Sequence, residues 1–390
     1  MKKVYIVLEI SILVAVIGII GLWIRQGGLK NFKLQMDISA EEKKIAKTSA
    51  SPKVELKEAM HYHKLGKKLV RCGLCFRRCT IKPNKRGFCG VRENKNGTLY
   101  SLVYNQPCSV NIDPIEKEPV YHFFPGTEIL CVATAGCSMR CKFCQNWSIS
   151  QAKPEEVSSI YLPPEDIVAL AKKRNCVGVS FTYSEPTVFY EYMLEISKEA
   201  KRQGLKVIIH TCGVMNPEPL KELLKYLDAV TIDLKGFTDE FYKTAIPDGS
   251  VEHVLNTIKI VKASGVWLEL VNLVIPKMND NPEDIKRMCR WIKETLGTDV
   301  PVHFSRFFPA YRMKDFPSTP IETLEQAYKI ATDTGLNYVT IGNVPGHEKN
   351  STFCPKCKKR LIHRIHFEVV KNDVVNGKCR FCSQKIPGIW

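Results

Sequence analysis

Between residues 128 and 343 the sequence alternates short apolar runs, rich in β-branched residues, with amphipathic segments of helical period. The apolar runs predict strands at 129–133, 177–183, 206–211, 229–234, 267–275, 302–307 and 338–341. The segments between them predict helices at 164–174, 187–203, 217–227, 252–263, 282–296 and 321–334, several with a proline in the first turn. Strands that alternate with helices form parallel βαβ units. We therefore expect an α/β fold closed into a partial or full (β/α) barrel, with ligands at the carboxyl ends of its strands.

Three cysteines lie in the loop after the first of these strands. Cys137, Cys141 and Cys144 follow the spacing Cys-x3-Cys-x2-Cys within TAGCSMRCKFCQNW at 134–147. A fully ligated iron–sulfur cluster usually has four cysteine ligands, so three thiolates leave one iron of a four-iron cluster open. An open metal position is what separates a reactive site from a structural one. The loop therefore predicts a reactive [4Fe–4S] cluster, with Phe143 as an apolar wall beside it.

This loop resembles the cluster-binding signature of radical S-adenosylmethionine (SAM) enzymes. The longer stretch 120–151 resembles the AmmeMemoRadiSam-system radical SAM enzymes, which are related to pyruvate formate-lyase activating enzyme. The similarity runs from about residue 60 to residue 390. It includes DPIEKEPVYHF at 113–123, FTYSEPT at 181–187, DAVTIDLKGF at 228–237, PVHFSRFFPAYRM at 301–313 and IGN at 341–343.

The resemblance implies a radical-SAM-type partial barrel that cleaves SAM reductively at the cluster. The product is a 5′-deoxyadenosyl radical, which takes a hydrogen atom from a small molecule or a protein. Implied protein substrates or partners are a glycyl-radical enzyme or Memo-like and AMMECR-like proteins. A one-electron donor such as ferredoxin or flavodoxin is implied as well, and nucleic acid is not expected.

The resemblance also implies SAM contacts at the strand ends. Glu185, in the tripeptide Ser-Glu-Pro, stands where the family holds the methionine amino group, with Ser184 in place of a glycine. From the residues alone, Glu185 also fits an acid at a helix amino terminus. Asp233 and Lys235 resemble an Asp-x-Lys pair beside SAM, the lysine reaching towards the SAM carboxylate. Because side chains alternate along a strand, both lie on the same face. This arrangement is equally consistent with an ordinary salt bridge between them.

Two further positions are implied at neighbouring strands. Thr211 follows His210, which replaces the family's usual acid at a level where SAM or a cation binds. His303, which we expect with Arg306 at the end of the sixth strand, resembles a family residue near the SAM ribose, although a lone strand histidine also fits a structural role. Asn272 on the fifth strand is a weaker polar candidate.

The carboxyl-terminal region carries two Cys-x2-Cys pairs, Cys354 with Cys357 and Cys379 with Cys382, separated by 21 residues. Two such pairs at this distance are typical of a four-thiolate zinc ribbon. A rubredoxin-like iron is the alternative. A strand is expected at 366–370 between the pairs. A fully ligated zinc would stabilise folding rather than perform chemistry.

A second four-cysteine motif precedes the barrel, with Cys72, Cys75, Cys79 and Cys89 spaced Cys-x2-Cys-x3-Cys-x9-Cys. It resembles the family's amino-terminal motif, with Phe76 where a proline is common. Four ligands fit either zinc or a second [4Fe–4S] cluster. Zinc would make the module structural or partner-binding, whereas a cluster would make it an electron relay.

The charge and the remaining cysteines restrict the cellular setting. The net charge of +17 belongs to the flanking cysteine modules, since residues 61–95 hold eleven Lys or Arg against one acid and residues 353–390 hold nine against two. Such patches fit phosphates, acidic proteins or anionic lipid, or simply solvated small modules. Eleven of the 16 cysteines fall in metal-ligand clusters, which indicates a reducing cytoplasm rather than disulfides. The other five fit ordinary buried residues: Cys108, Cys131, Cys176, Cys212 and Cys289.

The amino terminus predicts a membrane anchor. Residues 4–24 form an apolar run broken only by Glu9 and Ser11, and about 20 apolar residues span a bilayer. No Ala-x-Ala-like cleavage site follows the run. Five Lys or Arg follow it within about 20 residues, so the positive-inside rule places the enzyme in the cytoplasm.

The expected domains are a transmembrane anchor at 1–24, a linker at 25–55, an amino-terminal four-cysteine module at 56–115, the core barrel at 116–345 and a zinc-ribbon-like module at 346–390. A short helix is expected near 55–65. Two other functions fit the same sequence: a membrane-tethered metal-binding scaffold, which would hold zinc and turn over no SAM, and a two-cluster electron-transfer protein.

Overall fold

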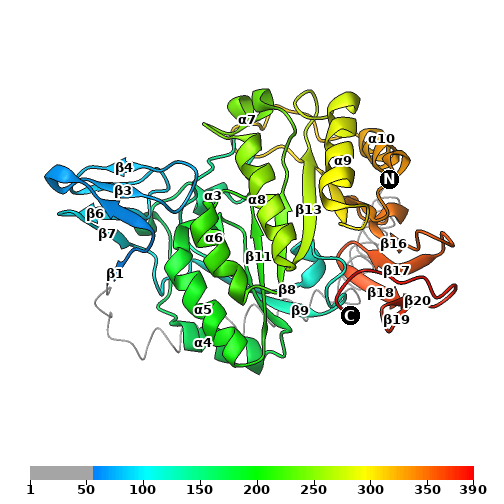
Figure 1. The fold of residues 1–390 in the computed structure, drawn as a ribbon, viewed down its shortest axis with the longest axis horizontal. Helices are drawn as coiled ribbons and strands as arrows, with labels where there is room; N and C mark the ends of the chain where they lie inside the picture. The colour runs from blue at the N-terminus through cyan, green and yellow to red at the C-terminus, as the bar shows by residue number, and fades with distance from the viewer. Residues whose placement is uncertain (1–55) are drawn as a thin grey trace, which may run out of the picture. The chain divides into compact units, whose positions relative to one another are not determined.

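The computed structural model describes residues 56–390, which form one compact unit (Figure 1). At its centre is an eight-stranded sheet in the order β15-β14-β13-β12-β11-β10-β9-β8. Strands β9 to β15 pair in parallel, and β8 joins β9 antiparallel. Because β8 and β15 are the two ends of this order, the sheet does not close on itself, which agrees with the expected partial barrel. The strands are β8 (Ser109–Pro114), β9 (Glu128–Ala133), β10 (Gly178–Phe181), β11 (Lys206–Thr211), β12 (Ala229–Asp233), β13 (Trp267–Val274), β14 (Val302–Arg306) and β15 (Val339–Gly342).

Amphipathic helices connect the parallel strands, and α5, α6, α8 and α9 lie in front of the sheet in Figure 1. In α9 the buried residues recur at helical spacing, from Ile285 to Leu296, while Asn281 caps the first turn by accepting the backbone N–H groups of Glu283 and Asp284. The α-helices are α3 (Trp147–Ser150), α4 (Pro164–Lys173), α5 (Tyr190–Arg202), α6 (Pro217–Leu223), α7 (Asp239–Ala245), α8 (Val251–Ser264), α9 (Pro282–Leu296) and α10 (Ile321–Thr334).

The amino-terminal cysteine module consists of two small antiparallel sheets, β1-β7-β6-β5 and β2-β3-β4. The helix expected near 55–65 is wrong. Within the described part of that range the backbone forms two short strands that complete the exposed edges of β7 and β3, and His61 between them has a φ of 54°. Edge pairing therefore overrides local helix propensity. The strands are β1 (Lys57–Glu58), β2 (Tyr62–Lys64), β3 (Val70–Cys72), β4 (Thr80–Ile81), β5 (Lys85–Arg86), β6 (Arg92–Lys95) and β7 (Thr98–Ser101).

The carboxyl-terminal module is a three-stranded antiparallel sheet with a separate two-stranded hairpin. A strand lies between the two cysteine pairs, as expected, but it covers Glu368–Asn372 instead of 366–370, because His366, at a φ of 57°, and Phe367 form the turn that precedes it. The strands are β16 (Thr352–Phe353), β17 (Arg360–Ile365), β18 (Glu368–Asn372), β19 (Val374–Val375) and β20 (Lys378–Cys379).

Short 3-10 turns complete the described secondary structure. They are η1 (Gly66–Lys68), η2 (Ile115–Lys117), η3 (Pro154–Glu156), η4 (Pro186–Phe189), η5 (Leu224–Tyr226) and η6 (Glu348–Asn350). The predicted anchor at 1–24 and linker at 25–55 lie outside the described residues. Within 56–390, none of the helices combines the length and apolar character that crossing a membrane requires.

Candidate active site

A cavity of about 1580 Å³, counting the part open to solvent, lies among the loops that follow the barrel strands. It collects residues from β11 through β15, from the loops that follow β9 and β10, and from the turn between β17 and β18. Every residue predicted for the catalytic cluster or for SAM lines this one cavity: Cys137, Cys141, Cys144, Glu185, Thr211, Asp233, Lys235 and His303.

The cysteine loop leaves the buried strand β9 and is held by backbone hydrogen bonds at both ends. The N–H of Gly136 donates to Ile149 at 3.0 Å, and the N–H of Lys142 donates to Ala245 at 3.0 Å. Cys137 and Cys141 are buried, and Cys144 is half-buried. Among the described residues, the three sulfurs do not form a group within 4.8 Å of one another. This spacing is too wide for one ion and suits thiolates on different corners of a cluster.

Glu185 is buried, lines the cavity and accepts four hydrogen bonds. Its Oε1 accepts the Thr187 N–H and hydroxyl and the Thr211 hydroxyl (2.7 Å), whereas Oε2 accepts only the Cys212 N–H (2.8 Å). Glu185 thus caps η4, as the helix-terminus interpretation predicted, and still has acceptor capacity facing the cavity. The positive φ of this turn falls on Tyr183 (61°), so the position of Ser184 does not require glycine.

Thr211 therefore holds Glu185 in place, since its hydroxyl donates to that carboxylate and also accepts the Gly213 N–H. The buried Thr211 hydroxyl therefore has a donor and an acceptor partner within the protein, and its burial is explained without a ligand. Its predicted contact with SAM stays a prediction.

Asp233, at the end of β12, binds two cationic partners on the cavity wall. The Lys235 ammonium lies 2.7 Å and His210 Nε2 lies 3.2 Å from its carboxylate. Burial alone would raise the pKa of Asp233, but these two charges hold it below its usual value. Burial by itself would lower the pKa values of Lys235 and His210, yet Asp233 raises both. The predicted salt bridge therefore exists, and it keeps a charged lysine inside the cavity.

His303 is the second residue of β14, so its expected place at the end of the strand is wrong. It lies deep in the cavity, where Nε2 is 2.7 Å from Glu269 and Nδ1 is 2.6 Å from the Thr340 hydroxyl. Its proposed role beside the SAM ribose stays a prediction, since both ring nitrogens already have protein partners.

Glu269 is the buried residue that sequence reasoning missed. It accepts the backbone N–H groups of Tyr121 and His122 and the Trp267 indole N–H, besides its contact with His303. Burial raises its pKa, but the histidine and indole hydrogen bonds bring the value down to about 2. A single acid inside the apolar run WLELVNLV was the available signal.

The weaker candidate Asn272, and Arg306 at the end of β14, form hydrogen bonds outside the cavity. Asn272 donates to the carbonyl of Leu234 at 2.7 Å and lines a separate space beside α9. Arg306 donates to the carbonyl of Thr319 at 2.8 Å, which fixes the loop after β14. Phe367, at the turn of the carboxyl-terminal module, is the unexpected member of the cavity wall.

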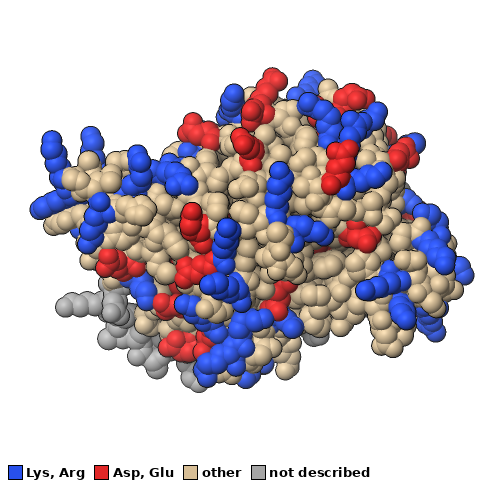
Figure 2. Space-filling view, in the orientation of Figure 1, with Lys and Arg blue, Asp and Glu red and all other residues tan. Residues whose placement is uncertain are grey.

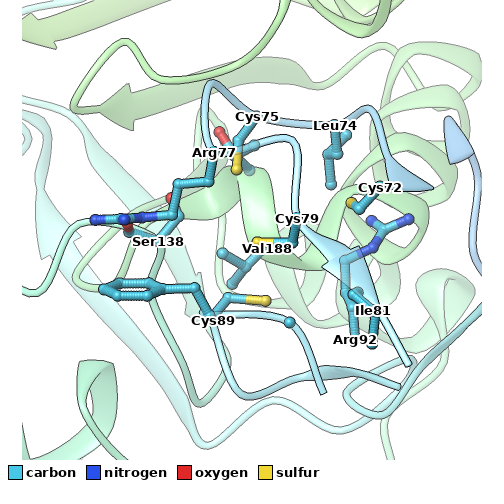
Figure 3. A pocket seen from close by; sticks show the side chains of 13 residues that line it. Cys72, Leu74, Cys75, Arg77, Cys79, Ile81, Cys89, Arg92, Ser138 and Val188 are labelled. Carbon is cyan, nitrogen blue, oxygen red and sulfur yellow. The ribbon is translucent and has the colours of Figure 1, made fainter. Parts of the chain in front are cut away.

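The two four-cysteine sites differ in geometry. In the carboxyl-terminal site the sulfurs of Cys354 and Cys382 are 3.6 Å apart and those of Cys357 and Cys379 are 3.7 Å apart, and all four fall within 4.8 Å of one another. The four amino-terminal cysteines instead line a space of about 370 Å³, counting the part open to solvent (Figure 3).

The main cavity fits a three-cysteine cluster with SAM on its open iron. The donor set is three thiolates from one loop, and Glu185 offers a free acceptor position to an ammonium. Lys235 offers a buried cation to a carboxylate. The volume leaves room for a nucleoside-sized molecule beside the sulfurs.

Comparison with known proteins agrees with this site. Residues 131–292 match the Radical SAM superfamily. The uncharacterized protein MJ0808 of Methanocaldococcus jannaschii is 46% identical over 333 residues, which are 85% of this chain and 99% of that protein. A pyruvate formate-lyase-activating enzyme of Clostridium pasteurianum is 27% identical, over 43% of this chain and 72% of its own. A putative glycyl-radical enzyme activating enzyme, MJ1227 of M. jannaschii, is 29% identical, over 41% of this chain and 66% of its own.

Proposed function

Because the chain belongs to the radical SAM superfamily, we propose that it cleaves SAM at the cavity described above and directs the resulting radical at a protein substrate. When bound, a [4Fe–4S] cluster on Cys137, Cys141 and Cys144 supplies the electron that splits SAM into methionine and a 5′-deoxyadenosyl radical. The observation that carries the proposal is that these cysteines, Glu185 and Lys235 line one cavity.

The protein's own residues bind and orient SAM. Glu185 accepts the methionine ammonium on Oε2, which has a single protein partner. Lys235 meets the methionine carboxylate, and Asp233 keeps that lysine charged and directed along the cavity wall. A substrate held at two charged ends loses the freedom to misplace its reacting bond.

Apolar residues of the cysteine loop exclude water from the reacting centre. Met139 and Phe143 are almost fully buried and line the same cavity as the three cysteines. A radical generated behind these side chains meets few solvent atoms before it meets its substrate. No amino-acid base or nucleophile is required for this chemistry.

A protein as substrate is supported by the relatives named as activating enzymes and by aromatic residues near the cysteine loop. Trp147, which follows the loop directly, stacks on Tyr311 with ring centroids 5.5 Å apart and is 45% exposed. Phe367 is an aromatic residue on the cavity wall itself. Exposed aromatic side chains are typical of surfaces that bind protein segments. The proposed substrates are a glycyl-radical enzyme or the Memo-like and AMMECR-like proteins of the AmmeMemoRadiSam system, whose radical SAM enzymes this sequence resembles.

The test is anaerobic reconstitution followed by measurement of 5′-deoxyadenosine formed from SAM with a strong reductant. We expect turnover by the wild type and none by the variant Cys137→Ala/Cys141→Ala/Cys144→Ala. Candidate proteins added to the assay should gain a radical signal or increase turnover. A wild type with a full cluster that releases no 5′-deoxyadenosine would refute the proposal.

We also propose that the carboxyl-terminal cysteines bind a structural zinc. Zn–S bonds of about 2.3 Å in a tetrahedron put the sulfurs about 3.8 Å apart, and the two measured pairs are at 3.6 and 3.7 Å. Four protein ligands leave no open position, so this ion would stabilise the module. Zinc that remains after the catalytic cluster is removed would support the assignment, and iron in its place would contradict it.

Finally, we propose that the chain is anchored by its first 24 residues with the catalytic unit in the cytoplasm. The support is the apolar run and the basic residues that follow it. Deletion of residues 1–30 should release protein from the membrane fraction with SAM cleavage intact. A chain that starts near residue 26 and lies outside the cytoplasm would contradict this orientation.

A further inference from the structure

The amino-terminal cysteines are spaced too widely for a single zinc ion. A zinc held by four thiolates brings all four sulfurs to about 3.8 Å from one another. Across residues 56–390, no three of Cys72, Cys75, Cys79 and Cys89 lie within 4.8 Å of each other, whereas all four carboxyl-terminal sulfurs do. In this respect the amino-terminal site matches the catalytic Cys137 loop and differs from the zinc-like site.

The space between these four sulfurs is lined by groups that lack partners. It measures about 370 Å³ when the gaps between atoms and the part open to solvent are counted, and its walls are mostly apolar, including Leu74, Ile81 and Val188. Arg92 and Ser138 line it, and Nε and Nη1 of Arg92 and Oγ of Ser138 are buried without a hydrogen-bond partner. In Figure 3 Arg92 lies beside Cys72, and Ser138 lies across the space.

These unpartnered donors indicate what kind of group fits the space. A buried guanidinium or hydroxyl without an acceptor costs about 1–3 kcal/mol, more for a charged group, so a group that accepts several hydrogen bonds would be stabilised here. Glu191 Oε1, 3.0 Å from Nη2 of the buried Arg92, balances the guanidinium charge but leaves Nε and Nη1 without acceptors. The sulfides and thiolates of an iron–sulfur cluster accept such bonds and need more room than one ion.

The same space adjoins the catalytic loop. Cys137 lines the catalytic cavity, while its neighbour Ser138 lines the amino-terminal one. Gly136 packs so closely that a Cβ there would lie 2.6 Å from the carbonyl oxygen of Cys89. Arg77, between Cys75 and Cys79, donates to the carbonyl of Ser138. Ligand-bearing loops of the two sites are therefore in direct backbone contact.

From these observations we propose that Cys72, Cys75, Cys79 and Cys89 bind a second [4Fe–4S] cluster that relays electrons to the catalytic one. All four irons are ligated by protein, so this cluster binds no SAM. It accepts one electron from a low-potential protein donor and passes that electron to the catalytic cluster, returning to its oxidised form with no proton transferred. The relay role rests on the proposed SAM cleavage, whereas the cluster assignment does not.

The donor is inferred to be an acidic protein, because the outer face of the module is basic. Figure 2 shows Lys and Arg side chains protruding at the end of the molecule where Figure 1 places β3, β4, β6 and β7. Opposite charge on the donor would steer association at a rate that falls with ionic strength. The exposed basic residues are Lys64, Lys67, Lys68, Arg71, Arg78, Lys82 and Lys85.

The first test counts metals in the full-length protein after anaerobic reconstitution with ⁵⁷Fe. We expect about eight irons and one zinc per chain, with two Mössbauer components of equal area, of which only one changes when SAM is added. The variant Cys137→Ala/Cys141→Ala/Cys144→Ala should keep about four irons that do not respond to SAM. Two zincs and about four irons in the wild type, with no iron in the variant, would overturn the cluster assignment.

The second test separates the relay from the catalytic site. The variant Cys75→Ala/Cys79→Ala should lose at least tenfold in 5′-deoxyadenosine formation with reduced flavodoxin, yet keep wild-type turnover with a small reductant such as titanium(III) citrate. Equal rates with flavodoxin would refute the relay. Equal loss with both reductants, in protein that retains its zinc and the SAM-responsive Mössbauer component, would also refute it. Without those two markers, the wild-type iron count alone decides the cluster.

The third test concerns the basic face. Lys82→Glu/Lys85→Glu should slow reduction by flavodoxin severalfold and flatten its salt dependence. The matched control is Lys286→Glu/Arg290→Glu on the exposed face of α9, which should change neither. Equal slowing by both pairs would show that net charge, and not this face, governs docking. None of these variants should alter turnover with titanium(III) citrate.

Discussion

Replacing Glu185 with glutamine should separate SAM binding from loop stability. Glutamine keeps an oxygen where Oε1 accepts three donors, but its amide nitrogen then faces the Cys212 N–H, now 2.8 Å from a carboxylate oxygen. That backbone N–H cannot rotate, so it loses its acceptor at a cost of about 1–3 kcal/mol of folding free energy. The loss should appear as a lower Tm in every state of the protein.

The effect on SAM adds to this loss and is measured separately. A charge-assisted hydrogen bond to the methionine ammonium is worth roughly 1.5–3 kcal/mol, which is about a tenfold to 150-fold change in Kd. The control is Thr211→Val, which removes one donor to the same carboxylate but leaves its charge. We expect Thr211→Val to lower Tm and to change the Kd for SAM less than tenfold.

The assay is anaerobic calorimetric titration of SAM into each cluster-loaded variant, with 5′-deoxyadenosine formation measured at varied SAM. Both variants should hold wild-type iron, since neither residue is a cluster ligand. An unchanged SAM Kd in Glu185→Gln, with intact cluster and turnover, would show that the carboxylate only organises the turn around η4.

Three further predictions concern the framework around the site. Cys357→Ser should release the zinc and lower Tm, and full zinc retention measured by mass spectrometry would contradict the assignment. Burial lowers the pKa of His122 to about 4, so below about pH 6.5 the unfolded chain takes up a proton that the folded chain does not. The free energy of unfolding should therefore fall by up to about 3 kcal/mol between pH 6.5 and pH 4. In denaturant titrations at several pH values, His122→Asn should make this fall smaller. Arg364→Met leaves the buried Glu116 carboxylate without its cation and should cost about 3–5 kcal/mol, which an unchanged denaturation midpoint would refute.

The barrel was predictable because its parallel strands are buried on both faces and therefore stand out as apolar runs. β8 was missed because SVNIDP carries polar residues and a proline, and it is a strand only through antiparallel pairing with β9 at the sheet edge. The helix α7 is short, and its boundaries are set by the Thr238 cap rather than by a long apolar period. The turn at His366 requires a left-handed backbone conformation, and the residue at this position is not the glycine that usually indicates one.

Within the site, residues near strand ends were easier to predict than residues inside strands. Cys137 lies in the loop after β9 and Asp233 ends β12, and both line the cavity. Each belongs to a short sequence motif that could be recognised before the structure was known. The strand that contains His303 was predicted correctly, but His303 was expected at the end of this strand and is its second residue. Glu269 joins backbone groups 147 and 148 residues away in sequence, and no local pattern encodes such a partner.

The three cysteine sites show why spacing alone did not identify their metals. In the carboxyl-terminal site each Cys-x2-Cys pair comes from one tight turn, so two turns that face each other make a tetrahedron of sulfurs. In the amino-terminal site the four cysteines come from the end of β3, the loop after it, the approach to β4 and the loop before β6. Four separate backbone positions surround a volume instead of converging on a point. The same count of thiolates is therefore compatible with zinc in one module and with a cluster in the other, and the distance between sulfurs is the property that distinguishes them.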